Sequence, residues 1–113
     1  MEEIPESDRI YIQVDEAPEF PGGVAKLLEY VQKNIRYPVM ARENGITGKV
    51  LVGFIIEQDG SISNVKVIKG IGGGCDEEAV RVVQSLPKFA NPGKIDGEPV
   101  RVQYTLPIMF ALP

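Results

Sequence analysis

The residues of this chain that could do chemistry gather around one glycine-rich segment, Gly70–Gly74, which runs directly into Cys75 and three acids. Glycine-rich loops can hold phosphate groups with their backbone N–H groups. This one lacks the Lys-Ser/Thr pair of a phosphate-binding loop, and the acids at Asp76–Glu78 would repel a phosphate. The neighbouring strands are predicted to form an antiparallel hairpin, which argues against a dinucleotide-binding βαβ unit. We therefore interpret the segment as a flexible link between a strand and a helix.

The sequence contains few residues of the types that bind metals or catalyse reactions. It contains no histidine and a single cysteine, and a lone cysteine cannot build a structural zinc site. Asp59 lies in a turn that is too short and too poor in acids to bind calcium. Glu77 and Glu78 point about 100° apart on a helix and make a poor carboxylate pair. We expect no enzyme, no metal and no cofactor. Cys75 is expected to be a small, partly buried residue, although its place at a helix start leaves open a reactive thiol.

Charge is distributed unevenly along the chain. The net charge is −4, but residues 1–21 hold seven acids against Arg9 alone, so the remainder is mildly basic. The acidic start predicts no signal peptide, and the longest apolar run, residues 106–113, is far shorter than the roughly 20 residues of a transmembrane helix. The chain therefore divides into an acidic, partly extended leader, residues 1–19, and one α+β domain, residues 20–113.

Two helices and three long strands are predicted for the domain. Val24, Leu27, Leu28, Val31 and Ile35 form an amphipathic stripe that predicts a helix over 24–35. A short helical turn is expected at 39–44, and a second helix at 77–86 with Asp76 as its N-cap. Strands are predicted at 49–57 and 61–69, joined by the tight turn Asp59-Gly60, and at 100–110. The alternation of residues 9–14 predicts a further strand at the sheet edge.

Several short motifs occur in an order that is specific only when they are taken together. They are Phe20-Pro-Gly-Gly23, Tyr37-Pro38 with Ala41, Gly45 and Gly48, Val50 with Phe54, Asp59-Gly60, Asp76 with Ala79, Pro92-Gly93-Lys94, Gly97-Glu-Pro-Val100, and Pro107-Ile108 with Phe110. This order resembles the carboxy-terminal domain of TonB-type energy transducers over residues 20–112. Phe89 stands where that family often has tryptophan, and we expect it to anchor the core.

The resemblance implies a fold and a function. The fold is a three-stranded antiparallel sheet with two helices packed on one face. We expect the strand order second–first–last, because a hairpin pairs the first two strands and a helix then carries the chain back to the free side of the first. The function is to bind the short "TonB box" of outer-membrane transporters in the periplasm by β-strand addition. The domain would be coupled to an ExbB/ExbD-type proton-channel motor through an inner-membrane anchor and spacer that are missing from this sequence. A homodimer is also possible in this picture.

Two other functions remain open at this stage. Similar domains form the periplasmic tail of BlaR-type membrane metallopeptidases, where the domain would act as a sensor or interaction module. A free-standing adaptor is the third alternative. The preceding sequence would separate them, because a single anchor with a Pro-rich spacer favours transduction, whereas several membrane helices with a zinc-protease motif favour sensing.

The predicted binding residues are Arg101, Gln103, Thr105 and Pro107. A proline has no N–H, so within a sheet it is tolerated where that group would face an open edge. Backbone groups alternate in direction along a strand, so those of Arg101, Gln103 and Thr105 are expected to point the same way as Pro107. If strand 100–110 is an edge, the first three residues would bond to a docked peptide, and Pro107 would limit the contact at the far end.

The acidic start of the leader leads to a first prediction. Residues 1–8 carry acids and a proline but little apolar surface, so they are expected to be mobile and dispensable. A chain that starts at Ile10 should melt within a few degrees of the parent in a thermal scan. A much larger fall in the melting temperature would show that these residues are docked on the fold.

Overall fold

A tight hairpin of two long strands forms the centre of the fold. The computed structural model describes residues 8–113. Strands β2 (Gly48–Ile56) and β3 (Ile62–Lys69) pair in antiparallel fashion. In the turn between them, the carboxylate of Asp59 accepts hydrogen bonds from the N–H and the hydroxyl of Ser61. These bonds lower the pKa of Asp59 to about 2, so the carboxylate stays ionised and keeps the turn closed at neutral pH.

The third long strand, β5 (Glu98–Phe110), pairs with the other side of β2. The path β5-β2-β3 matches the predicted order second–first–last. Strand β2 is buried on both of its faces. Val52 and Phe54 face the helices and the main core, while Ile55, opposite Gln103 on the other face, is only 4% exposed. A strand with two apolar faces belongs in the middle of a sheet, which is where β2 lies.

Two short strands correct the expectation of a three-stranded antiparallel sheet. Strand β1 (Ile10–Tyr11) pairs in parallel with β5, so the sheet is mixed, and it is shorter than the predicted segment 9–14. Strand β4 (Gly93–Ile95) forms a hairpin with β5 across Asp96-Gly97. The sequence indicated only a turn there, because the three residues of β4 are too few to show alternation. Both central residues of this hairpin have positive φ, 51° and 79°, as a two-residue turn between twisted strands requires.

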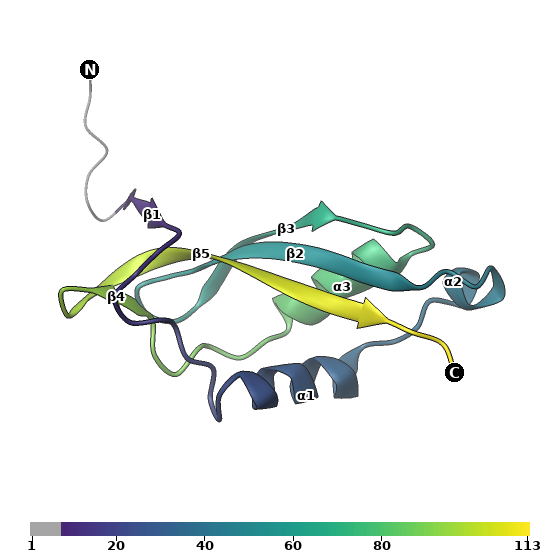
Figure 1. The fold of residues 1–113 in the computed structure, drawn as a ribbon, viewed down its shortest axis with the longest axis horizontal. Coiled ribbons are helices and arrows are strands. Elements are labelled where there is room, and N and C mark those ends of the chain that lie inside the picture. The colour runs from purple at the N-terminus through teal and green to yellow at the C-terminus, as the bar shows by residue number, and fades with distance from the viewer. Residues whose placement is uncertain (1–7) are drawn as a thin grey trace, which may run out of the picture.

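The described residues also form three helices, which lie next to the sheet. They are α1 (Val24–Asn34), α2 (Val39–Glu43) and α3 (Cys75–Gln84) (Figure 1). The predicted start of the second long helix was wrong: α3 begins at Cys75 with Gly74 as N-cap. The side chain of Asp76 accepts hydrogen bonds from the N–H groups of Ile71 and Gly72, and so closes the glycine loop instead of capping the helix. No helix within residues 8–113 is long and apolar enough to cross a membrane.

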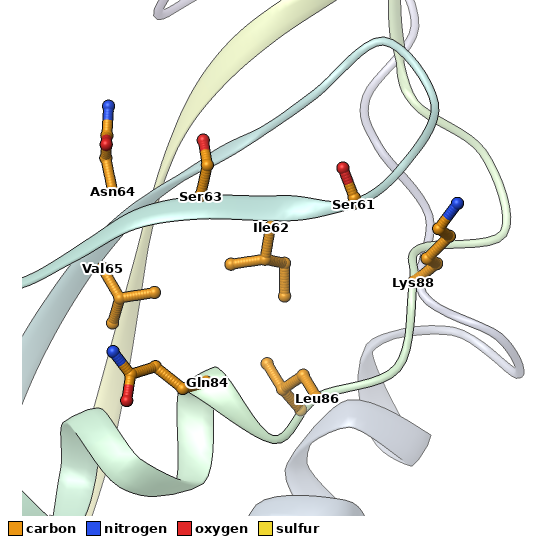
Figure 2. A pocket seen from close by; sticks show the side chains of 8 residues that line it. All are labelled: Ser61, Ile62, Ser63, Asn64, Val65, Gln84, Leu86 and Lys88. Atoms are coloured by element: carbon orange, nitrogen blue, oxygen red, sulfur yellow. The ribbon is translucent and has the colours of Figure 1, made fainter.

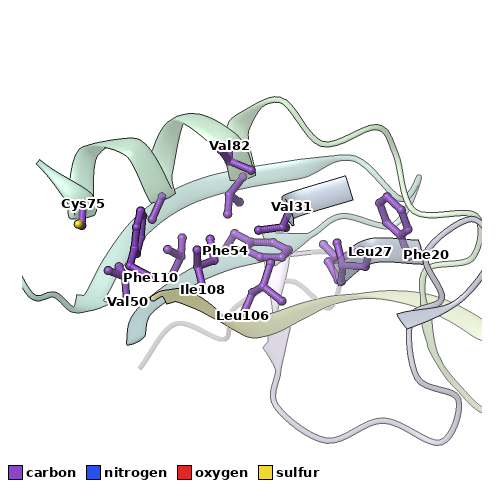
Figure 3. Close-up of a cluster of buried hydrophobic side chains, with 14 of the residues drawn as sticks. Phe20, Leu27, Val31, Val50, Phe54, Cys75, Val82, Leu106, Ile108 and Phe110 are labelled. Carbon is purple, nitrogen blue, oxygen red and sulfur yellow. The ribbon is translucent and has the colours of Figure 1, made fainter. Parts of the chain in front are cut away.

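The core lies between the sheet and helices α1 and α3 (Figure 3). Phe54 stands at its centre with Leu27 and Val31 of α1 on one side and Val82 of α3 on the other. Phe89 is buried and has ring contacts with Phe20, Phe54 and Tyr104 at centroid distances of 5.4, 6.4 and 5.8 Å. Phe89 is therefore a core anchor, as expected.

The segment before α1 lies along the β4–β5 hairpin. The N–H groups of Asp15 and Glu16 both donate to the carbonyl of Lys94, and the N–H of Lys94 donates to Glu16. The side chain of Asp15 also accepts a hydrogen bond from the N–H of Asp96 at 2.8 Å. Residues 8–19 are thus partly joined to the sheet. Of residues 1–8, which were predicted to be mobile, the structure describes only Asp8, and its carbonyl accepts a hydrogen bond from Arg101. Residues 1–7 lie outside the described residues.

The position of Phe54 gives a prediction for stability. Its side chain is 1% exposed and contacts residues from both helices and from β5. Phe54→Ala should lower the free energy of unfolding by about 3–5 kcal/mol, because it leaves a cavity that the surrounding elements cannot all close. Denaturant titration measures this loss. A loss under about 1 kcal/mol would show that β2 is not the central strand.

Candidate functional site

The sheet leaves backbone without a partner strand on the outer side of β3 and along much of the outer edge of β5, where the predicted binding residues lie. Two prolines show which residues of β5 point their backbone N–H and C=O groups toward this outer edge. Pro99 lies opposite Lys94, whose N–H donates to Glu16 on the far side of β4, and Pro107 lies opposite Leu51 of β2. Both prolines occupy positions where the ladder needs no donor from β5. The even-numbered residues of β5 therefore bond to β4 and β2, and the odd-numbered residues direct their backbone groups outward.

Strand β1 covers the beginning of this outer edge. Ile10 is paired with Arg101 and Tyr11 with Val102. The expectation that Arg101 lies on an open edge is therefore wrong at this residue, where the chain has added a strand of its own. The alternation of Ile10 and Ile12 predicted an edge strand, but it carried no information on which edge it would pair with. For that reason the sequence did not predict that β1 would pair with β5 at Arg101.

The side chain of Arg101 helps to hold the leader at this position. Its Nε donates to Glu57 at 2.8 Å, its Nη2 lies 3.3 Å from the other oxygen of Glu57, and its Nη1 donates to the carbonyl of Asp8 at 3.1 Å. The hydrogen bond from Arg101 is the largest cause that lowers the pKa of Glu57, which also accepts a bond from Ser63. A lowered carboxylate pKa means that the pair stabilises the fold above the ordinary pKa of glutamate. That contribution is lost as pH falls through the lowered value.

Beyond β1 the edge is open. Because Val102 bonds to β2, its parallel pairing with Tyr11 is made by the neighbouring groups of β5, which include the N–H of Gln103. From Thr105 to Phe110, no other strand within residues 8–113 pairs with the outer side of β5. The side chain of Gln103 lies across the sheet, because a Cβ added at Gly53 would approach its Nε2 to 3.0 Å. Thr105 and Pro107 are exposed. The structure thus places Gln103, Thr105 and Pro107 along the outer edge of β5, with Gln103 at the end of β1 and Thr105 and Pro107 beyond it.

The other groups that could do chemistry are satisfied within the fold. Cys75 is fully buried, and burial, followed by the nearby Asp76 and Glu77, raises the pKa of its thiol, which disfavours the reactive thiolate. Residues 8–113 contain no group of three or more histidine, cysteine, aspartate or glutamate side chains placed to hold a metal ion.

A hollow of 420 Å³ lies between β3 and the segment that follows α3 (Figure 2). Ile62 and Leu86 point toward each other across it, with Val65 and Gln84 beside them, whereas the side chains of Ser61, Ser63 and Asn64 point to the other side of β3. Its one charged side chain, Lys88, lies 3.5 Å from Asp59 in the hairpin turn. The hollow therefore offers no acid–base pair.

Comparison with known proteins identifies the family. The model of the Gram-negative bacterial TonB protein C-terminal family matches residues 33–112, well over half of the chain. The chain belongs to this family. Two curated TonB proteins from Helicobacter pylori, strains J99 and 26695, are 46% identical to it over 44 residues, or 39% of this chain. The matched part spans only 16% and 15% of those TonB proteins.

Solved structures of TonB domains share the fold. Two NMR solution structures of the Helicobacter pylori TonB C-terminal domain match with TM-scores of 0.58 and 0.60. The first is 29% identical and covers 78% of this chain and 91% of that domain. The second is 28% identical and covers 80% of each chain. An α+β fold with a mixed sheet and three helices therefore agrees with TonB domains of known structure.

Amide hydrogen exchange tests how β1 covers the edge. In the full chain, the amide of Arg101 should be protected by β1, while that of Thr105 exchanges fast. Deleting residues 1–14 should accelerate exchange at Arg101 by about tenfold or more, because it removes the local pairing without opening the core. Val102, which bonds to β2, is the internal control and should stay slow. Equal exchange at Arg101 in both chains would contradict the pairing of β1 with β5.

Proposed function

We propose that this chain is the periplasmic peptide-binding domain of a TonB-type energy transducer. It binds the TonB box, a short extended segment of an outer-membrane transporter, by adding it as a strand to β5. The observation that carries the proposal is the open edge of β5 from Thr105 onward in a domain of the TonB family. Strand β1 supports it, because it shows that the same edge accepts a strand at Arg101 and Val102.

Main-chain hydrogen bonds supply most of the contact in this mode of binding. The outward backbone groups of Thr105 lie beyond the end of β1, so they bond to the docked segment first, whereas the N–H of Gln103 is reached only if the segment displaces β1. Pro107 has no N–H to offer and limits the contact toward the end of β5. At Arg101 the incoming segment either stops at β1 or displaces it. Such binding depends little on the side chains of the transporter segment.

The domain transmits force and does no chemistry in this proposal. A strand joined to β5 by several parallel hydrogen bonds resists a pull along its length, because the bonds share the load. The pull comes from an inner-membrane motor of the ExbB/ExbD type, through the N-terminal part that TonB proteins carry. The result is active uptake of a nutrient through the outer membrane. The same edge could alternatively pair with a second copy of the domain, which would form a homodimer.

Removing one backbone N–H that points outward from β5 tests strand addition directly. Thr105→Pro removes a backbone N–H at an exposed position, next to a strand segment that already tolerates Pro107. It should weaken binding of a ten-residue TonB-box peptide by about tenfold or more, because it leaves an acceptor of the peptide without a partner. Isothermal titration calorimetry measures the affinity, and circular dichroism checks that the variant is folded.

Thr105→Val is the matched control, since it keeps the N–H and the branched shape of the side chain. It should bind the peptide like the parent. Hydrogen exchange provides a second readout, in which the amide of Thr105 slows when the peptide is added. Equal affinity of Thr105→Pro and Thr105→Val, with no slowing of this amide in the parent, would overturn the proposal.

A further inference from the structure

Helix α1 carries three distinct faces. Leu27 and Val31 are buried in the core. All of its charged side chains lie together on a second face, where Glu29 pairs with Lys26 at 3.1 Å and with Lys33 at 2.9 Å. The third face carries Val24 and Leu28, which are 63% and 47% exposed. No charged residue of α1 lies on this third face, and we call Val24 and Leu28 the apolar ledge.

The ledge points away from α3. At 100° per residue, Val24 and Leu28 lie about 60° and 100° from Leu27 in one direction, and Tyr30 lies about 60° away in the opposite direction. Tyr30 faces the end of α3, because its hydroxyl donates to the carbonyl of Ser85 at 2.7 Å. The ledge therefore faces the side of α1 that is remote from α3.

The side of α1 that is remote from α3 is also the side on which the open edge of β5 lies. Figure 1 shows α1 running alongside the second half of β5, displaced beyond the strand in the direction away from β2 and β3. Helices α1 and α3 cover the same face of the sheet, because both pack on the core that the even-numbered residues of β5 line. A strand added next to β5 would therefore extend the sheet over α1, with the apolar ledge beneath it.

We propose that the apolar ledge selects the peptide that docks on β5. In an added strand, successive side chains point to opposite faces, so every second one points toward α1. The ligand is therefore an extended peptide with apolar side chains at alternate positions, and those side chains lie on Val24 and Leu28. This inference rests on the proposed function, since it requires that a peptide is added to β5.

A peptide fits this surface better than a second copy of the domain does. Two β5 edges paired in antiparallel fashion about a twofold axis would bring both helix layers to the same face. Each α1 already extends beyond its own edge, so the helices of the two copies would crowd each other. An isolated strand has no helix layer and avoids this conflict. The uncharged ledge also gives no partner to a charged side chain, which favours apolar residues at the alternate positions.

Two peptides of equal composition and two double variants test the inference. The first peptide alternates valine with serine over ten residues, and the second carries the same valines in adjacent pairs; both have a terminal lysine for solubility. The parent should bind the alternating peptide about tenfold more tightly, which is the effect expected from burying one or two further aliphatic side chains. Val24→Ser with Leu28→Ser should abolish this preference and keep the weaker affinity common to both peptides.

Helix α2 offers a matched control. Val39 and Met40 are also exposed, at 70% and 63%, but they lie at the far end of β2 from the β2–β3 turn and on a different helix. Val39→Ser with Met40→Ser should leave the preference for the alternating peptide unchanged. Because the ledge residues are exposed, both double variants should keep the melting temperature of the parent within a few degrees, which a thermal scan checks.

The outcomes separate this inference from the proposed function. If the parent binds both peptides equally, or if the ledge variant keeps the preference, the ledge does not select the ligand. In that case Thr105→Pro must still weaken the binding of both peptides if the proposed strand addition is correct. If the parent binds neither peptide, both proposals fail. Sedimentation of the parent should show a monomer. A dimer that dissociates in the ledge variant would mean that a second copy covers the ledge, which overturns the peptide as its occupant.

Discussion

The fold depends on the burial of both faces of β2. A strand without access to water must have its backbone groups paired on both sides, because an unpaired buried N–H or C=O costs free energy comparable to a lost hydrogen bond. Strand β3 fills one side through the hairpin at Asp59-Gly60, and β5 fills the other. This requirement leaves β5 with one paired side and one outer side. The site that we propose is therefore a consequence of how the core is completed.

Side chains and backbone of β5 serve separate purposes. The even-numbered side chains, such as Leu106 and Ile108, are buried, and the same residues bond to β2 through their backbone. The odd-numbered residues present their backbone groups to the outer edge. A site made of main-chain groups places few demands on residue type, which is consistent with a shared fold at 28–29% identity to known TonB domains. Pro107 is an exception, because its missing N–H is a property of the residue itself.

Several charged groups that were considered for chemistry in the sequence stabilise loops and turns of the fold. Asp76 closes the glycine loop, Asp59 closes the central hairpin, and Glu57 holds Arg101. Each carboxylate accepts hydrogen bonds from groups within the chain, and Cys75 is buried as a thiol. The surface that we propose for a partner consists of a backbone edge and two aliphatic side chains of α1.

The sequence by itself determined the elements whose signals are local. The periodicity of α1, the alternation of β5, the two apolar faces of β2 and the Asp-Gly turn each reflect a pattern or a backbone preference within a few residues, and the elements that they predict were confirmed. The predicted apolar stripe of α1 was only partly right, because Val24 and Leu28 are exposed. The tertiary structure alone decided the parallel pairing of β1, the cover over Arg101 and the exposure of Leu28. A period shows which side of a strand or helix is apolar, but it does not show which distant segment lies against it. That depends on contacts between residues far apart in the chain, as between Ile10 and Arg101.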